Sequence, residues 1–304
     1  MVNEATSQTD DIEYIEIRYR PGVGDPARVF RSMARLIESV YRIEQDLVGS
    51  LTIGIEPQLV LERVEAGSIR AVLRRLLTQV DDDALKGLDW KPLIGQYLVR
   101  GKHRLLRWLN GRNRIQDRSE VIQLQQDLVG LVPPPAAAGH LFPRPVPTNK
   151  LLADVQSVAE AVRDLETQDE AIYVAGGEST TVNKSFSITP EDIEDLLTEE
   201  SVSNTAEMIL LIKKPDYLGS SRWEFRLGDH TVEAKIVDEE WLERFRNREF
   251  PLAPGDALRA RVRTELRRGF ENSVVSTHHY VEKVYEVRRG SAATQLPLAD
   301  DEGT

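Results

Sequence analysis

A row of arginines in the last third of the chain is the pattern with the clearest chemical content. From Leu258 to Arg267 apolar and polar residues alternate, which predicts a β-strand, because side chains two positions apart share a face. The apolar face is expected to be buried and the polar face to be in water. The polar face carries the arginines, which are Arg259, Arg261, Arg263 and Arg267.

These guanidinium groups have two possible partners. They could contact the phosphates of a nucleic acid, because arginine–phosphate contacts provide most sequence-independent affinity. They could instead form a charge ladder with glutamates on neighbouring strands, where opposite charges stabilise a sheet modestly. We favour the ladder, because Trp223 and Phe225 are expected to face inward and few aromatic rings remain for base stacking. The expected ladder partners are Glu224, Glu233, Glu282 and Glu286.

A second basic segment runs from Arg100 to Arg118. It predicts an amphipathic helix with Leu98, Leu105 and Trp108 toward the core. Such a helix could contact anionic lipid or nucleic acid, or it could present an ordinary solvated face, which we favour. We expect Arg100, His103, Arg104 and Arg107 opposite the apolar stripe, and the candidate macromolecule-binding residues here are Arg100, Lys102, Arg104 and Arg107.

Other motifs give weaker signals for chemistry. The loop Gly22-Val23-Gly24 precedes a helix but lacks the glycine pattern of nucleotide-binding loops, so we interpret it as a turn. Ser179 lacks the flanking pattern of a hydrolase nucleophile. The five histidines show no metal-ligand spacing, and adjacent His278 and His279 would point to opposite faces of a strand. We therefore expect no catalytic residue, no metal and no cofactor.

Composition sets the limits for the class of protein. The chain has 304 residues, 40% hydrophobic and 29% charged, with a net charge of -11, which is enough for two folded domains and disfavours indiscriminate binding to nucleic acid or membrane surfaces. Cysteine is absent, which excludes disulfides and cysteine chemistry. Neither a signal peptide nor a transmembrane segment is visible. We expect a cytoplasmic protein.

The first half of the chain predicts an α/β domain over residues 11–131, after a disordered tail at 1–10. A strand at Ile12–Arg20 leads to a helix that starts near Asp25 and ends near Val48. A strand at Gln58–Val64 and a helix from Ser68 follow, so we expect a βαβα unit with a parallel strand pair. Further helices are expected after Asp81, from Asp89 to about Asn110, and at Arg118–Leu128.

Six prolines in residues 132–149 predict an extended linker, and we place the domain boundary there. The C-terminal domain is expected to cover residues 150–290, with a helix from Lys150, a strand at Ala171–Ala175 that pairs with Ser185–Ile188, and a helix from Thr189. An acidic disordered tail is expected at 291–304. From residue 207 onward we expect a small β-barrel or curled sheet, with strands at Met208–Ile212, Trp223–Leu227, Thr231–Val237, Ala257–Leu266 and Tyr280–Val287 and a helix at Asp238–Asn247.

The sequence thus predicts a two-domain α+β protein. Because no catalytic motif is visible, we expect a non-enzymatic interaction or regulatory protein that binds another macromolecule, most simply a protein. Two alternatives remain open. One is a nucleic-acid-binding protein that uses the arginine strand, and the other is a hydrolase whose site has no local motif.

Overall fold

The computed structural model describes residues 12–51, 54–65, 68–79, 90–132, 143–217, 221–270 and 273–290. The expected tails, the expected helix after Asp81 and much of the proline-rich segment lie outside these residues. The fold is mixed α+β, with two sheets and, in the described residues, six helices. The chain divides into two compact units, Met1–Leu196 and Leu197–Thr304.

The N-terminal unit is built on a five-stranded sheet with the strand order β2-β3-β1-β4-β5. Strand β1 pairs antiparallel with β3 on one side and with β4 on the other. The strands are β1 (Ile12–Arg18), β2 (Ile55–Glu65), β3 (Ile69–Gln79), β4 (Glu170–Ala175) and β5 (Glu178–Thr181).

The prediction of a βαβα unit with a parallel strand pair was wrong. The segment after Ser68, expected to be a helix, is strand β3, and it pairs antiparallel with β2. The apolar residues of this segment fit both periods, because Ala71 and Leu73 are two apart while Leu73 and Leu77 are four apart. Short-range spacing therefore could not distinguish a helix from the second arm of a β-hairpin. The expected return strand at Ser185–Ile188 was also wrong, since β4 pairs with β5.

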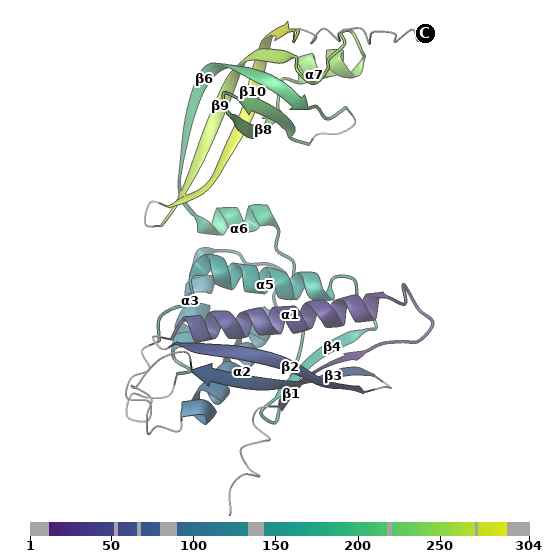
Figure 1. Cartoon of the computed structure of the whole chain (residues 1–304), viewed down its shortest axis with the longest axis vertical. Helices are drawn as coiled ribbons and strands as arrows, with labels where there is room; N and C mark the ends of the chain where they lie inside the picture. The colour runs from purple at the N-terminus through teal and green to yellow at the C-terminus, as the bar shows by residue number, and fades with distance from the viewer. Residues whose placement is uncertain are drawn as a thin grey trace, which may run out of the picture. The chain divides into compact units, whose positions relative to one another are not determined.

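Helices cover one face of this sheet. Helix α1 (Arg28–Gly49) carries a continuous buried stripe, and helix α5 (Thr148–Val162) packs on its far side, so that the sheet, α1 and α5 form successive layers (Figure 1). Helices α2 (Trp90–Leu109) and α3 (Arg118–Val129) agree with the expected bounds within two residues. Helix α6 (Pro190–Leu197) starts with a capping contact, in which the amide of Asp192 donates to Oγ1 of Thr189.

The expected domain boundary at 132–149 differs from the division seen in the structure. Strand β4 follows the proline-rich segment in the chain, yet it pairs with β1 in the same sheet. Helix α5 likewise packs on α1. The segment therefore connects two parts of one unit, and the units divide between Leu196 and Leu197.

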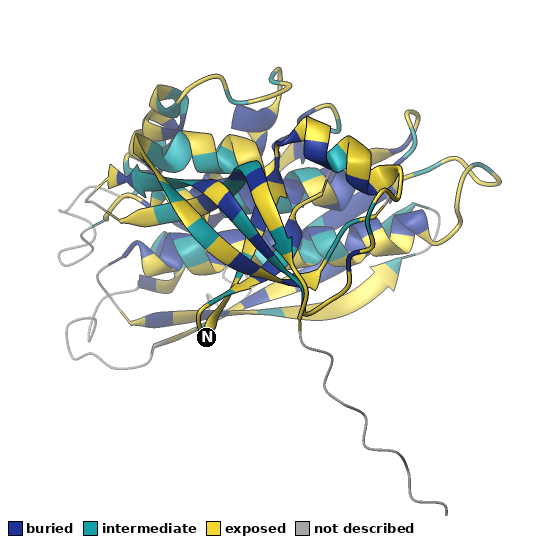
Figure 2. Ribbon diagram, turned by 90° about the horizontal axis from the view of Figure 1, so that it is seen from above, coloured by how far each residue is buried: buried dark blue, intermediate teal, exposed yellow. Residues whose placement is uncertain are grey.

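The C-terminal unit is a closed ring of strands in the order β10-β8-β7-β6-β9. Strand β9 pairs antiparallel with both β6 and β10, which closes the ring. Buried and more exposed residues alternate in β7 and in the first half of β9, and Figure 2 shows positions of both kinds along the strands of the molecule. The elements are β6 (Thr198–Lys214), β7 (Trp223–Leu227), β8 (His230–Ile236), α7 (Glu239–Arg246), β9 (Ala257–Gly269) and β10 (Val274–Arg288).

The ring encloses an aromatic core. Trp223 and Phe225 face inward as expected, at 2% and 0% exposure. Trp223 contacts Trp241 and Phe245 of helix α7 edge to face, at ring-centroid distances of 5.9 and 5.1 Å. The sequence identified every strand of this ring but underestimated β6 and β10, which begin ten and six residues before the predicted Met208 and Tyr280.

Candidate binding sites

Four arginines of β9 lie on the outer wall of the ring and each forms an ion pair with a glutamate; they are Arg259, Arg261, Arg263 and Arg267. Nη1 of Arg259 lies 2.7 Å from Glu207, and its Nε lies 3.2 Å from Glu286. Arg261 and Arg263 both reach Glu282, at 3.4 and 3.3 Å. These contacts form a charge ladder, and the predicted ladder partners Glu282 and Glu286 are part of it.

Glu265 completes the ladder. Nη1 of Arg263 lies 3.0 Å from one oxygen of Glu265, and Nε of Arg267 lies 3.0 Å from the other. The four guanidinium groups are thus surrounded by four carboxylates, those of Glu207, Glu265, Glu282 and Glu286. Glu224, which was expected in the ladder, pairs with Lys213 instead. The sequence could have indicated the role of Glu265 in the ladder, because Glu265 lies two residues from both Arg263 and Arg267 and so shares their strand face.

An apolar patch surrounds Arg259 on the same wall. The register places Ile209 of β6 beside Arg259 and Glu286 of β10 on its other side. The guanidinium of Arg259 lies 5.4 Å from the ring centroid of Tyr285, which is within cation–π range. Ile209, Leu211 and Tyr285 are 50%, 36% and 47% exposed. We call Ile209, Leu211, Arg259 and Tyr285 the outer-wall patch.

The basic residues of helix α2 do not form one surface. Lys102 is fully buried, which corrects its assignment as a macromolecule-binding residue. Arg104 pairs with Asp127 of helix α3, and Arg107 pairs with Glu178 of β5. Of the four, Arg100 alone has no ion-pair partner among the residues that the structure describes.

His103 is buried at 2% exposure, so its expected place opposite the apolar stripe was wrong. Its Nδ1 lies 2.7 Å from Oγ1 of Thr180, and its Nε2 lies 3.1 Å from the carbonyl oxygen of Ala175. The carbonyl can only accept, so Nε2 carries the proton and Nδ1 accepts from the threonine hydroxyl. Burial lowers the pKa of His103, which favours this neutral form.

Lys102 belongs to a buried charge cluster that the sequence analysis missed. Its Nζ lies 2.5 Å from Glu13 and 2.7 Å from Glu44. Arg75 lies 2.6 Å from each of the same two carboxylates. The hydroxyl of Tyr173 donates to Glu13 at 2.8 Å. We call Glu13, Glu44, Arg75, Lys102 and Tyr173 the buried charge cluster.

This cluster fixes its own ionisation. Burial alone would raise the pKa of Glu13, but the charges of Lys102 and Arg75 outweigh it and lower the pKa to about 2. Burial and the charge of Glu13 raise the pKa of Tyr173. Glu13 is therefore ionised and Tyr173 keeps its proton. The sequence contained one indication of this cluster. Glu13 shares a strand face with Ile15 and Ile17, which places a charged residue at a core position.

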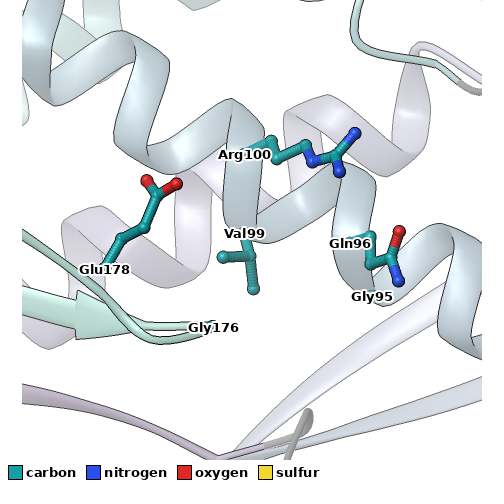
Figure 3. A pocket seen from close by; sticks show the side chains of 6 residues that line it. All are labelled: Gly95, Gln96, Val99, Arg100, Gly176 and Glu178. Carbon is teal, nitrogen blue, oxygen red and sulfur yellow. The ribbon is translucent and has the colours of Figure 1, made fainter.

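Three of the pockets formed by the described residues lie in the N-terminal unit. One, of about 400 Å³, lies at the loop Gly22–Gly24, where both glycines have positive φ as an irregular turn requires. A second, of about 330 Å³, lies between α5 and residues 184–190. The third, of about 230 Å³, lies between helix α2 and the β4–β5 turn (Figure 3). Ser179 lies on β5, paired with Val174.

Metal-binding and membrane-spanning features are absent from the described part of the chain. No group of three His, Asp or Glu side chains there could hold a metal ion. None of the helices described has the length and apolar character needed to span a bilayer.

Comparison with known proteins finds no matching family model, no similar curated protein and no similar solved structure.

Proposed function

We propose that this protein is a non-enzymatic interaction protein that binds another protein through the outer wall of its C-terminal ring, which we regard as a small β-barrel. The observation that carries the proposal is the outer-wall patch. Ile209, Arg259 and Tyr285 come from three adjacent strands and expose a large apolar side chain on each side of an arginine.

The composition of this patch resembles the centre of a protein interface. Tyrosine and arginine are enriched among residues that contribute most to binding, because they combine a large apolar area with polar groups. The patch is bordered by ion pairs, since Arg259 contacts Glu207 and Glu286 and Lys213 contacts Glu224. An apolar centre with a polar border is the usual arrangement of such interfaces.

The charge balance of the wall supports a protein partner over a nucleic acid. Strong phosphate binding needs cations that are free to replace counterions. Arg259, Arg261, Arg263 and Arg267 of β9 are instead paired with glutamates at 2.7 to 3.4 Å. A polyanion would have to displace these carboxylates, whereas a protein surface of mixed charge would not.

The test is affinity purification of the tagged full-length protein from its native cells, with Ile209→Ser/Tyr285→Ser as the patch variant. The matched control is Val202→Ser/Val274→Ser, which changes two residues that are 43% and 64% exposed on the other face of the same strands. We expect the wild type and the control to retain one stoichiometric partner and the patch variant to lose it. Recovery of no stoichiometric partner by the wild type, or equal recovery by the patch variant, would refute the proposal.

A further inference from the structure

The pocket between helix α2 and the β4–β5 turn has charges of opposite sign on its two sides. Its wall is formed by Gly95, Gln96, Val99, Arg100, Gly176 and Glu178. Figure 3 shows Arg100 and Gln96 on one side, Glu178 on the other, and Val99 between them facing the backbone of Gly176. A Cβ atom at Gly176 would lie 3.1 Å from Cγ1 of Val99, so the backbone closes tightly against the apolar floor.

Both charged side chains of the pocket, Arg100 and Glu178, have polar atoms that no described residue occupies. Arg100 forms no ion pair with any described residue, whereas Arg104 and Arg107 on the same helix are both paired. The partner of Arg107 is Oε2 of Glu178, and Oε1 of Glu178 accepts no hydrogen bond from the described residues. The hydrogen bond from Arg107 lowers the pKa of Glu178, and the charge of Arg100 lowers it further. The pocket therefore presents one cation and one anion.

Contacts beside the pocket hold its two walls together. His103 of helix α2 bonds to the carbonyl of Ala175 at 3.1 Å and to Thr180 at 2.7 Å. These contacts lie on both sides of the β4–β5 turn, and Arg107 adds the ion pair to Glu178. A site whose walls are fixed before binding loses less entropy when a ligand arrives.

We propose that this pocket binds a small zwitterionic molecule of the amino-acid type. Its carboxylate pairs with Arg100, its ammonium group with Oε1 of Glu178, and its apolar part packs on Val99. Arginine can bind a carboxylate through two parallel hydrogen bonds, which orients the ligand. A volume of about 230 Å³ suits a molecule of this size. This site lies in the other unit from the outer-wall patch, and the proposal does not depend on the proposed function.

The experiment is a ligand-observed NMR titration of the full-length protein with four probes. L-valine has both charges, isovalerate has only the carboxylate, isobutylamine has only the ammonium group, and inorganic phosphate tests for a general anion site. We expect L-valine to bind with a Kd on the order of 1 mM and each single-charge probe to bind at least about tenfold more weakly. Absence of L-valine binding, or phosphate binding as tight as that of L-valine, would overturn the proposal.

Variants locate the site. Arg100→Gln and Glu178→Gln should each weaken L-valine binding by about tenfold or more. Arg104→Gln is the matched control, because it removes a cation from the same helix outside the pocket, and it should leave binding unchanged. Unaltered circular dichroism would show that each variant folds. Equal binding by wild type and Arg100→Gln would place the ligand elsewhere and reject the assignment.

Discussion

Nζ of Lys102 lies 2.5 Å from Oε2 of Glu13 in the interior of the N-terminal unit, and both side chains are fully buried. The contact joins helix α2 to the central strand β1. Together with Glu44 of α1, Arg75 of β3 and Tyr173 of β4, it connects five elements that are distant in sequence. Burying an ion pair costs desolvation free energy. Removing one partner costs more, because it leaves a buried charge that neither water nor an opposite charge stabilises.

Replacing Lys102 by methionine should therefore destabilise the protein by about 3 to 5 kcal/mol. The substitution keeps much of the side-chain volume but leaves Glu13 and Glu44 with Arg75 as their one cation. Urea denaturation followed by circular dichroism measures the loss. The double variant Lys102→Met/Glu13→Gln restores charge balance and should be more stable than Lys102→Met alone. A single variant as stable as the wild type would contradict a structural role for the cluster.

The stability that Glu13 contributes should depend on pH in the acid range. Its pKa in the folded state is about 2, below the ordinary value of 4.5. The unfolded state therefore binds the proton more readily, so the contribution is complete above about pH 4.5 and is lost as the pH falls toward 2. The variant Glu13→Gln should consequently lose more stability relative to the wild type at pH 6 than at pH 3. An equal difference at both values would show that the carboxylate is not ionised in the fold.

Asp154 should show the opposite dependence. It is 1% exposed on helix α5 and its Oδ1 has no hydrogen-bond partner among the described residues. Burial, with the nearby charge of Asp46, raises its pKa to about 8. The folded state thus retains the proton, and wild-type stability should fall by up to about 1.4 kcal/mol per pH unit between about pH 4 and 8.

The variant Asp154→Asn removes this titration. It should gain stability over the wild type as the pH rises from 5.5 to 8.5, as measured by urea denaturation. Glu160→Gln, an exposed change on the same helix, is the control and should keep a constant difference from the wild type over that range. A parallel pH profile for Asp154→Asn would mean that this carboxyl is already ionised in the folded protein.

The paired state of the β9 arginines predicts weak binding to nucleic acid. Fluorescence anisotropy with labelled single-stranded and duplex DNA at low salt should show no more affinity for the wild type than for Arg259→Gln/Arg261→Gln/Arg263→Gln. The reason is that the glutamates of the ladder already neutralise these guanidinium groups. Tight, salt-sensitive binding that the triple variant abolishes would instead support the nucleic-acid alternative.

The two units differed in how far their sequence predicted them. The ring strands were found because they lie beside water on one face, so that alternation marks each strand, as at Trp223–Leu227. Strand β3 was missed because Leu73 and Leu77 fit a helix as well as a strand. Its partner β2 carries few buried residues, so the hairpin had little alternation of its own to reveal it.

The candidate sites were predicted only in part. Alternation placed the arginines of β9 on one face, and opposite charges on other strands indicated a ladder, which the structure shows with Glu282 and Glu286. The outer-wall patch was missed because Ile209 and Tyr285 are far apart in the chain and meet only through the pairing of β6 and β10 with β9. The pocket beside Arg100 was missed because Arg100 and Glu178 are also far apart in the chain.

By itself the sequence determined the local periods, the faces of the strands in the ring and the absence of cysteine chemistry, because these depend on the types and spacing of neighbouring residues. The tertiary structure alone decided which partners the buried charges have. Glu13 shares the apolar face of its strand, but its partner Lys102 lies in a distant segment, and only the fold brings the two side chains together away from water. Long-range pairing is not encoded in any local spacing, so the positions of the sites followed from the fold.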